Sequence, residues 1–147
     1  MANALYDKGR NAFAMGDIAW KAAAGSVIRA MLVDSAVYTK DLANHDFLDD
    51  VPVGSRVSSA GGTAYDSGVQ LTLSDPVAGV CDANDITFTA VPTGGPYEYI
   101  LLYEDGGSEG ASGLIALIDT ATGLPITANG GDIVVTWDSG ANKIFKL

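Results

Sequence analysis

The residues that could carry chemistry in this chain are few and stand far apart. Among 147 residues there is one histidine, His45, and one cysteine, Cys81. A Ser-His-Asp triad needs a nucleophilic serine beside its histidine, and no Gly-x-Ser-x-Gly sequence lies near His45. His45 stands instead between Asn44 and Asp46, in a polar connector. We therefore expect a surface or capping histidine and no enzyme built around it.

The single cysteine and the acidic residues after it limit metal and redox chemistry. One Cys excludes a disulfide within the chain, and one Cys with one His excludes the Cys/His zinc clusters. Cys81 follows an apolar pair and precedes an acid, which predicts a half-buried, unreactive thiol. Residues 82–85 (Asp-Ala-Asn-Asp) offer oxygen ligands for calcium, but the twelve-residue calcium loop is absent. An Asx-turn is the alternative reading, and we expect no metal and no cofactor.

Two pairs of neighbouring carboxylates could supply an acid and a base. They are Asp49 with Asp50, and Glu104 with Asp105. Both pairs stand in polar turns, without the apolar surroundings that catalytic carboxyl groups need. The sequence therefore predicts a protein that is not an enzyme.

Aromatic side chains with polar tips are candidates for contact with a partner protein, and the sequence supports this role better than catalysis or metal binding. The chain has six Tyr and two Trp, and Tyr97, Tyr99 and Tyr103 occupy alternate positions of one expected strand. Such a stripe either packs at the edge of the core or forms an interface. Tyr97 and Tyr99 also flank Glu98, so a carbohydrate-binding surface is a further alternative. The candidate interface residues are Leu5, Phe13, Trp20, Tyr97 and Tyr99.

Charge is distributed unevenly along the chain. Eight bases and 18 acids give a net charge of −10, and residues 57–142 contain no Lys or Arg. A stretch this long without a positive side chain cannot neutralise phosphates, so we expect neither nucleic acid nor an anionic membrane as partner. The acidic stretch either keeps a β-rich surface soluble or faces a partner. Most of the bases precede residue 57, and we expect that part to approach an acidic or polar patch on a scaffold.

Length, apolar content and turn signals predict the architecture. The chain is long enough for one domain, residues 1–147, and its 48% apolar and 18% charged residues exclude intrinsic disorder. We expect a mainly β fold, an antiparallel β-sandwich or small barrel of about seven to nine strands, with a short N-terminal helix and a short helical connector. The expected strands are residues 17–20, 26–34, 54–60, 68–74, 86–91, 97–104, 114–119, 132–138 and 143–147. No apolar run has the length of a membrane span, and no secretory signal is expected.

The N-terminal segment, residues 1–16, is predicted to be helical and to pack on or dock beside the β domain. Asn3 can cap a helix that runs to about Met15, and Gly16 can end it. Gly9 inside this helix costs about 1 kcal/mol relative to Ala. Packing against another element must therefore hold the helix in place.

Two later segments also have helical character. The Ala-rich residues 21–24 make a helix from Ile18 to Leu32 an alternative to the two strands expected there. Residues 42–52 predict one or two helical turns, with Asn44 as a possible cap and Pro52 at the exit. This second segment is the expected helical connector.

The C-terminal residues predict a hairpin that closes the core. Ile133, Val135 and Trp137 alternate on one face, residues 138–142 form a turn, and residues 143–147 end the chain with apolar side chains. We expect removal of residues 143–147 to prevent folding. Removal of residues 2–15 is expected to leave a folded domain that attaches poorly to its partner.

Three stretches of the sequence carry a resemblance to a known group of proteins. The first is Asn3 to Arg10 (NALYDKGR), with Gly16-Asp17-Ile18 and Trp20, and the second is Leu42-Ala43 with His45-Asp46-Phe47-Leu48. The third and most specific is the ending from Leu114 to Leu147, LIALIDTATGLPITANGGDIVVTWDSGANKIFKL. Together they resemble small virion proteins encoded among the structural genes of tailed bacteriophages, over nearly the whole chain. The Ala-rich residues 21–25 depart from the pattern, since polar turn residues are expected there.

This resemblance implies a structural accessory of the virion. Such a protein decorates or cements the outer surface of the capsid, and its partners are the major capsid protein or other virion subunits. The resemblance further implies a homo-oligomer on the particle and a location in the virion, assembled in the host cytoplasm. A tail, neck or adaptor component is the alternative. No catalytic residues attach to the resemblance.

Overall fold

The structure, a computed structural model, describes residues 3–147 and is mainly β. Strands make up 31% of the chain and helices 14%, and the strands pair in an antiparallel manner. The predicted fold class is therefore confirmed. The described residues form twelve strands, more than the seven to nine expected, because several are two-residue pairings that leave no periodic pattern in the sequence.

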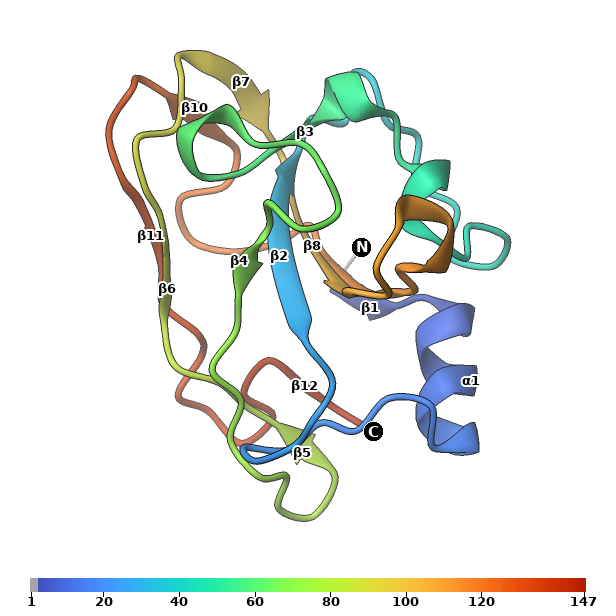
Figure 1. Cartoon of the computed structure of the whole chain (residues 1–147). Helices are drawn as coiled ribbons and strands as arrows, with labels where there is room; N and C mark the ends of the chain where they lie inside the picture. The colour runs from blue at the N-terminus through green and yellow to red at the C-terminus, as the bar shows by residue number, and fades with distance from the viewer. Residues whose placement is uncertain (1–2) are drawn as a thin grey trace.

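The elements follow one another along the chain as labelled in Figure 1. The strands are β1 (Ala4–Leu5), β2 (Ile28–Val33), β3 (Arg56–Val57), β4 (Val69–Gln70), β5 (Val80–Cys81), β6 (Ile86–Phe88), β7 (Gly94–Tyr97), β8 (Tyr99–Glu104), β9 (Leu114–Ile118), β10 (Ile126–Ala128), β11 (Ile133–Val135) and β12 (Phe145–Lys146). The helix is α1 (Asp7–Met15), and the 3-10 helices are η1 (Leu48–Asp50), η2 (Val53–Ser55), η3 (Ser59–Gly61) and η4 (Glu109–Ala111).

A six-stranded antiparallel sheet forms the centre of the molecule. Its strand order is β1-β9-β8-β2-β3, and β4 also pairs with β2. Its inner strands β2 and β9 are almost entirely apolar and are buried along nearly their whole length. Continuous apolar runs of this kind are typical of strands covered on both faces.

Two hydrophobic clusters cover the two faces of this sheet. Along β2, Ile28, Ala30 and Leu32 belong to the first cluster, whereas Met31 and Val33 belong to the second. This division follows from the alternation of side chains along a strand. The alternation fixes the register of the central strands, because a slip by one residue would exchange the two sets.

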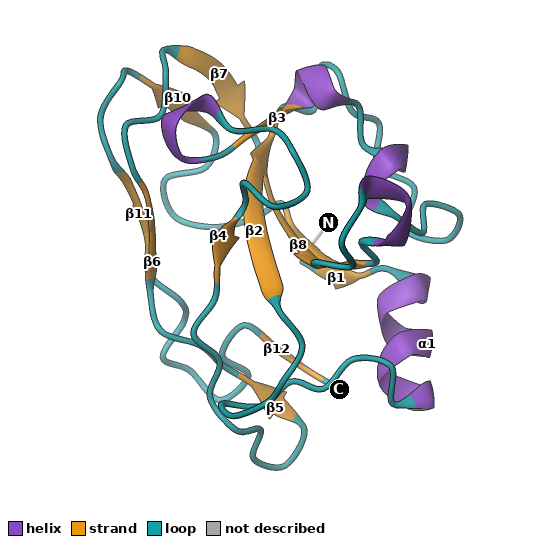
Figure 2. Ribbon diagram, in the orientation of Figure 1, coloured by secondary structure: helices purple, strands orange, loops and turns teal. Residues whose placement is uncertain are grey.

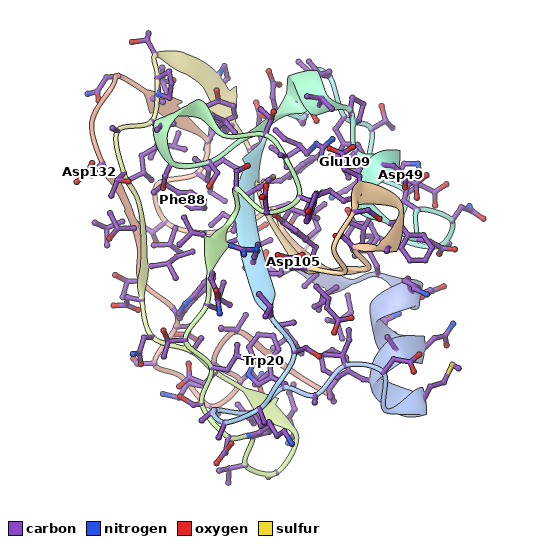
Figure 3. The ribbon with its side chains drawn as sticks, viewed as in Figure 1. Trp20, Asp49, Phe88, Asp105, Glu109 and Asp132 are labelled. Atoms are coloured by element: carbon purple, nitrogen blue, oxygen red, sulfur yellow. The ribbon has the colours of Figure 1, made fainter. Side chains whose placement is uncertain are left out.

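The first cluster lies between the central sheet and a second layer of short strand pairs. Those pairs are β6 with β11, β5 with β12, and β7 with β10. Phe88 of β6 is fully buried in this cluster, and Figure 3 shows it on the inner side of the β6–β11 pair. The two layers give a sandwich-like arrangement. Figure 2 shows α1 apart from β6 and β11 and next to β1, and Ala12 of this helix also belongs to the first cluster.

Helix α1 begins later than the sequence predicts. It starts at Asp7 rather than after Asn3, because Ala4 and Leu5 pair with β9. The predicted capping role of Asn3 is therefore wrong: its Oδ1 accepts hydrogen bonds from the backbone N–H groups of Asp119 and Thr120, both at 3.0 Å. The helix ends as predicted, with Gly16 in the left-handed region (φ 80°).

Gly9 allows α1 to approach the central sheet closely. A Cβ at this position would lie 2.8 Å from the Ile115 Cα in β9. Real Cβ atoms essentially never come this close to backbone, so only glycine fits. The residue that lowers helix propensity is thus the one that lets the helix pack.

For residues 17–32 the sequence leaves open two strands or one helix, and neither describes the first part of this segment. Residues 17–20 form no strand, and no helix runs from Ile18 to Leu32; strand β2 begins only at Ile28. A closed loop lies before it, in which the Ser26 N–H donates to the Ala19 carbonyl oxygen at 2.8 Å. The Trp20 indole N–H donates to the Asp82 carbonyl oxygen at 3.0 Å, which directs this loop toward β5.

The predicted helical connector, residues 42–52, contains one 3-10 helix, η1, whereas η2 follows Pro52 and lies outside the predicted segment. Asn44 does not cap either of them. The Asp50 carboxylate does this for η1, because it accepts hydrogen bonds from the backbone N–H groups of Asp46 (2.7 Å) and Phe47 (3.2 Å). The connector thus ends in a closed turn that packs Leu48 into the second cluster.

The predicted C-terminal hairpin is wrong. Strand β11 pairs with β6, and β12 pairs with β5, so the two strands expected to pair with each other have different partners. Trp137 supplies the reason: its backbone N–H donates to Asp85 and its indole N–H donates to the Asn84 carbonyl oxygen, both at 2.9 Å. These bonds hold the chain at the β5–β6 turn, and residues 138–142 then carry it to β5.

Candidate interaction groove

His45 contacts a buried pair of tyrosine hydroxyl groups, and Cys81 lies in the hydrophobic core. The Nδ1 atom of His45 lies 2.9 Å from the Tyr38 hydroxyl oxygen, and the same hydroxyl lies 2.9 Å from that of Tyr6. Cys81 is fully buried, and burial raises the pKa of its thiol to about 11. The thiol is thus more deeply buried than the half-buried one that the sequence predicts.

One Gly-x-Ser-x-Gly sequence, residues 106–110, was not identified from the sequence, and its geometry is not that of a nucleophile. Ser108 has extended backbone angles (φ −162°, ψ 165°), and a short 3-10 helix follows it. A nucleophile elbow instead needs a strained turn between a strand and a helix. The loop is closed by Ser112, whose hydroxyl donates to the Ser108 carbonyl oxygen at 2.6 Å.

The acidic residues singled out in the sequence are engaged in local contacts. The Asp82 carboxylate accepts a hydrogen bond from the Ala83 N–H at 2.9 Å, and Asp85 accepts one from Trp137. Asp105 forms an ion pair with Arg29 at 2.7 Å, so it is not free to act beside Glu104. Within residues 3–147, no group of three or more His, Cys, Asp or Glu side chains is placed to hold a metal ion.

The predicted tyrosine stripe is correct for Tyr99 and Tyr103, which share one face of β8 and pack in the core, and wrong for Tyr97. Tyr97 ends β7, which pairs with β10, whereas Tyr99 begins β8 of the central sheet. Tyr97 packs against the first cluster, and Tyr99 and Tyr103 belong to the second. The intervening Glu98 carboxylate accepts a hydrogen bond from the Ser35 N–H at 2.8 Å. The three residues therefore provide no platform of two aromatic rings beside a free carboxylate.

The other candidate interface residues come together at one end of the molecule, around Phe145. The Phe145 ring packs edge-on against Trp20 (5.1 Å between centroids) and tilted against Phe13 (5.8 Å). Trp20 is 5% exposed, so it supports the C-terminal strand from within. Leu5 and Phe13 are half-buried and line the surface beside it. Figure 3 shows Trp20 at this end, near β5 and β12.

A groove runs between this C-terminal strand and the N-terminal segment. It consists of two adjoining hollows of about 440 and 400 Å³, which share Leu5, Arg10 and Lys146. We call it the C-terminal groove. Strand β1, residues 116–118 of β9 and helix α1 form one wall, and residues 142–147 form the other. Leu5 and Phe13 were identified from the sequence, but the groove itself was not, because only the fold brings the two ends of the chain together.

The charged side chains that line the C-terminal groove are all basic. They are Arg10, Lys143 and Lys146, in a chain whose acids outnumber its bases 18 to 8. Arg10 pairs with Asp7 at 3.1 Å on the exposed surface, and Lys143 lies 3.9 Å from Asp82. Lys146 is exposed, and no described residue forms an ion pair with it. The groove is therefore a basic strip on an acidic protein.

The C-terminal groove presents apolar and basic side chains together. Its lining combines apolar side chains with Asn3, Asn142 and the three basic residues, while the histidine, the cysteine and the engaged carboxylates lie outside it. None of the helices in residues 3–147 has the length and apolar character needed to span a bilayer.

In comparison with known proteins, no family model matches this chain and no curated protein matches it.

Proposed function

We propose that this chain is a non-enzymatic virion structural protein that binds the outer surface of a tailed-bacteriophage capsid and stabilises the shell. The observation that carries the proposal is the C-terminal groove, a hollow of apolar and basic side chains on an otherwise acidic β fold. The resemblance of residues 3–20, 42–48 and 114–147 to phage virion proteins is the reason for proposing a phage particle as the structure to which the chain binds.

Multivalency is the physical basis of the proposed stabilisation. A protein that bridges neighbouring shell subunits adds contact area at each junction, so modest affinity per contact becomes strong retention when each copy touches two or three subunits. A fold with both faces of its central sheet buried is suited to this role, because a rigid bridge transmits load without ordering costs. The proposed partners are the major capsid protein or other virion subunits, and the proposed site of action is the virion.

The test is the copy number of the protein on purified particles of the phage that encodes it, together with the heat stability of those particles. We expect hundreds of copies per particle. Particles lacking the protein should release their DNA at a lower temperature, and purified protein added back should restore the original value. Tens of copies would point to a tail, neck or adaptor component, and absence from the particle would overturn the proposal.

A further inference from the structure

Leu5 of the edge strand β1 borders the C-terminal groove, together with residues 116–118 of the neighbouring β9. Strand β1 is the last strand on its side of the central sheet, and within the described residues only β9 pairs with it. Leu5 of β1 lines both hollows of the groove. A sheet edge beside a groove with apolar side chains is the geometry in which extended segments bind as added strands.

The register of β1 determines which of its backbone groups point away from β9. Tyr6 donates its N–H to the Ile115 carbonyl oxygen at 2.9 Å, and Leu5 stands opposite Ala116. In an antiparallel pair, residues whose N–H and C=O groups bond to the partner strand alternate with residues whose groups point away from it. Since Tyr6 bonds to β9, the N–H and C=O groups of Leu5 point away from β9. Asp7, the next residue in this outward row, already donates its N–H to the Leu42 carbonyl oxygen at 2.9 Å, so the open part of the edge lies at Leu5 and before it.

The chemistry of the groove indicates what binds there. The outward Leu5 groups offer one donor and one acceptor to an extended backbone, and the hollows accept apolar side chains. Arg10 and Lys146 border both hollows and offer charge-assisted hydrogen bonds to carboxylates. We propose that the edge of β1 binds an extended, acidic segment of a partner protein as an added strand; this inference rests on the proposed function and names the part of the partner that the groove recognises.

Charge disfavours a second copy of the chain at the same edge. Pairing two β1 edges would bring the basic rims of both grooves together, and like charges brought together at an interface oppose association. A nucleic acid is disfavoured because the groove offers only three basic residues to its phosphates, and the chain as a whole, with a net charge of −10, repels them. Both remain measurable outcomes of the experiment.

The experiment uses a fluorescent synthetic hexapeptide of alternating Glu and Val, titrated with the full chain and followed by anisotropy at low and at physiological salt. We expect saturable binding that weakens with salt. A peptide of alternating Lys and Val should not bind. A peptide with Pro in place of every Val should also fail, because it lacks the N–H groups that an added strand donates.

Charge-reversed variants locate the site. Lys146→Glu should weaken binding of the Glu-Val peptide about fivefold or more, because it replaces an attraction with a repulsion of similar size. The matched control is Lys21→Glu, which makes the same change in net charge at an exposed residue outside the groove and should change binding less than twofold. Equal effects of both variants would mean that net charge alone governs binding, and would overturn the proposal.

The remaining outcomes separate this proposal from the proposed function. If the wild-type chain attaches to particles and Lys146→Glu attaches equally well, the groove proposal fails and the virion role stands. If the peptide binds as expected but the protein is absent from particles, the virion role fails and the groove stands. Tighter binding of a single-stranded oligonucleotide than of the Glu-Val peptide, or dimers in sedimentation that Lys146→Glu strengthens, would replace the proposed occupant.

Discussion

The two ends of the chain face each other across the C-terminal groove, but they are held in different ways. At the N-terminal end, Tyr6 is fully buried in the second cluster and β1 is a strand of the central sheet. At the C-terminal end, Phe145 is half-buried, Leu147 is 55% exposed, and β12 contributes two residues of pairing. The N-terminal segment is therefore part of the core, whereas the C-terminal strand covers it from outside.

This difference reverses the ranking of the two deletions that the sequence suggested. Removing residues 2–15 takes away Tyr6, strand β1 and the helix that Gly9 packs on β9. Loss of one large buried aromatic side chain alone costs about 3–5 kcal/mol, which is a large part of the stability of a small domain. We expect this deletion to abolish cooperative folding, measured as loss of the thermal transition in circular dichroism.

The matched deletion is that of residues 143–147. It removes partly exposed side chains and one short pairing, so we expect a folded protein with a lower Tm. A cooperative transition in the N-terminal deletion, or an unfolded C-terminal deletion, would contradict the comparison.

A single methyl group provides a finer test of the N-terminal contact. Helix propensity alone predicts that Gly9→Ala stabilises the protein by about 1 kcal/mol. The structure predicts the opposite sign, because the new Cβ would lie 2.8 Å from backbone atoms of Ile115. We expect a net loss of about 1–3 kcal/mol in the free energy of unfolding, measured by urea denaturation.

The control for this substitution is Gly54→Ala, at a glycine with open space around it. There we expect a change within about 0.5 kcal/mol, or a small gain from reduced freedom of the unfolded chain. A stabilising Gly9→Ala would mean that α1 can move away from β9 without cost.

The sequence predicted the parts of the fold that local patterns specify. The central strands were found because Ile28–Val33 and Leu114–Ile118 are apolar runs of strand length. The end of α1 was found because Gly16 adopts the left-handed conformation that a helix end requires. These features depend on residues that are close together in the chain.

The errors arose where distant residues decide the structure. Asn3 reads as a helix cap, but it bonds to backbone 116 and 117 residues away. Trp137 reads as one more residue of a hairpin, but its hydrogen bonds reach Asn84 and Asp85. The C-terminal groove depends on the same kind of contact, since its walls come mainly from the two ends of the chain.

A hydroxyl deletion tests the polar contact beneath the N-terminal segment. Tyr38→Phe removes the hydroxyl group that contacts both the Tyr6 hydroxyl and the Nδ1 atom of His45. The Tyr6 hydroxyl would stay buried without this partner, and we expect a loss of about 1–2 kcal/mol in the free energy of unfolding. The control, Tyr97→Phe, removes a hydroxyl for which the described residues provide no hydrogen-bond partner, and it should cost less. Equal losses would show that the buried hydrogen-bond chain contributes nothing.

The smallest effect concerns local opening at the C-terminal end, and Cys81 reports it. Cys81 is fully buried and stands opposite Phe145 in the β5–β12 pair. A thiol reagent can reach it only when the strand opens, so the labelling rate at pH 8 measures that opening. We expect Phe145→Ala to raise this rate roughly five- to thirtyfold, corresponding to a loss of about 1–2 kcal/mol in the local opening free energy. Val134→Ala, at a side chain 65% exposed, should leave the rate unchanged.

The pH dependence of Cys81 sharpens the same comparison. Burial favours the neutral thiol and raises its pKa from an ordinary value near 9 to about 11. The stability contributed by the neutral thiol is therefore complete below about pH 9 and is lost as the pH rises through about 11. Replacing Cys81 with Ala should reduce the alkaline loss of stability between these values without removing it, because burial also raises the pKa of Tyr6 and Tyr103. An identical alkaline profile in wild type and C81A would mean that β12 opens before the thiol ionises, and that the C-terminal strand is held even more weakly than its contacts indicate.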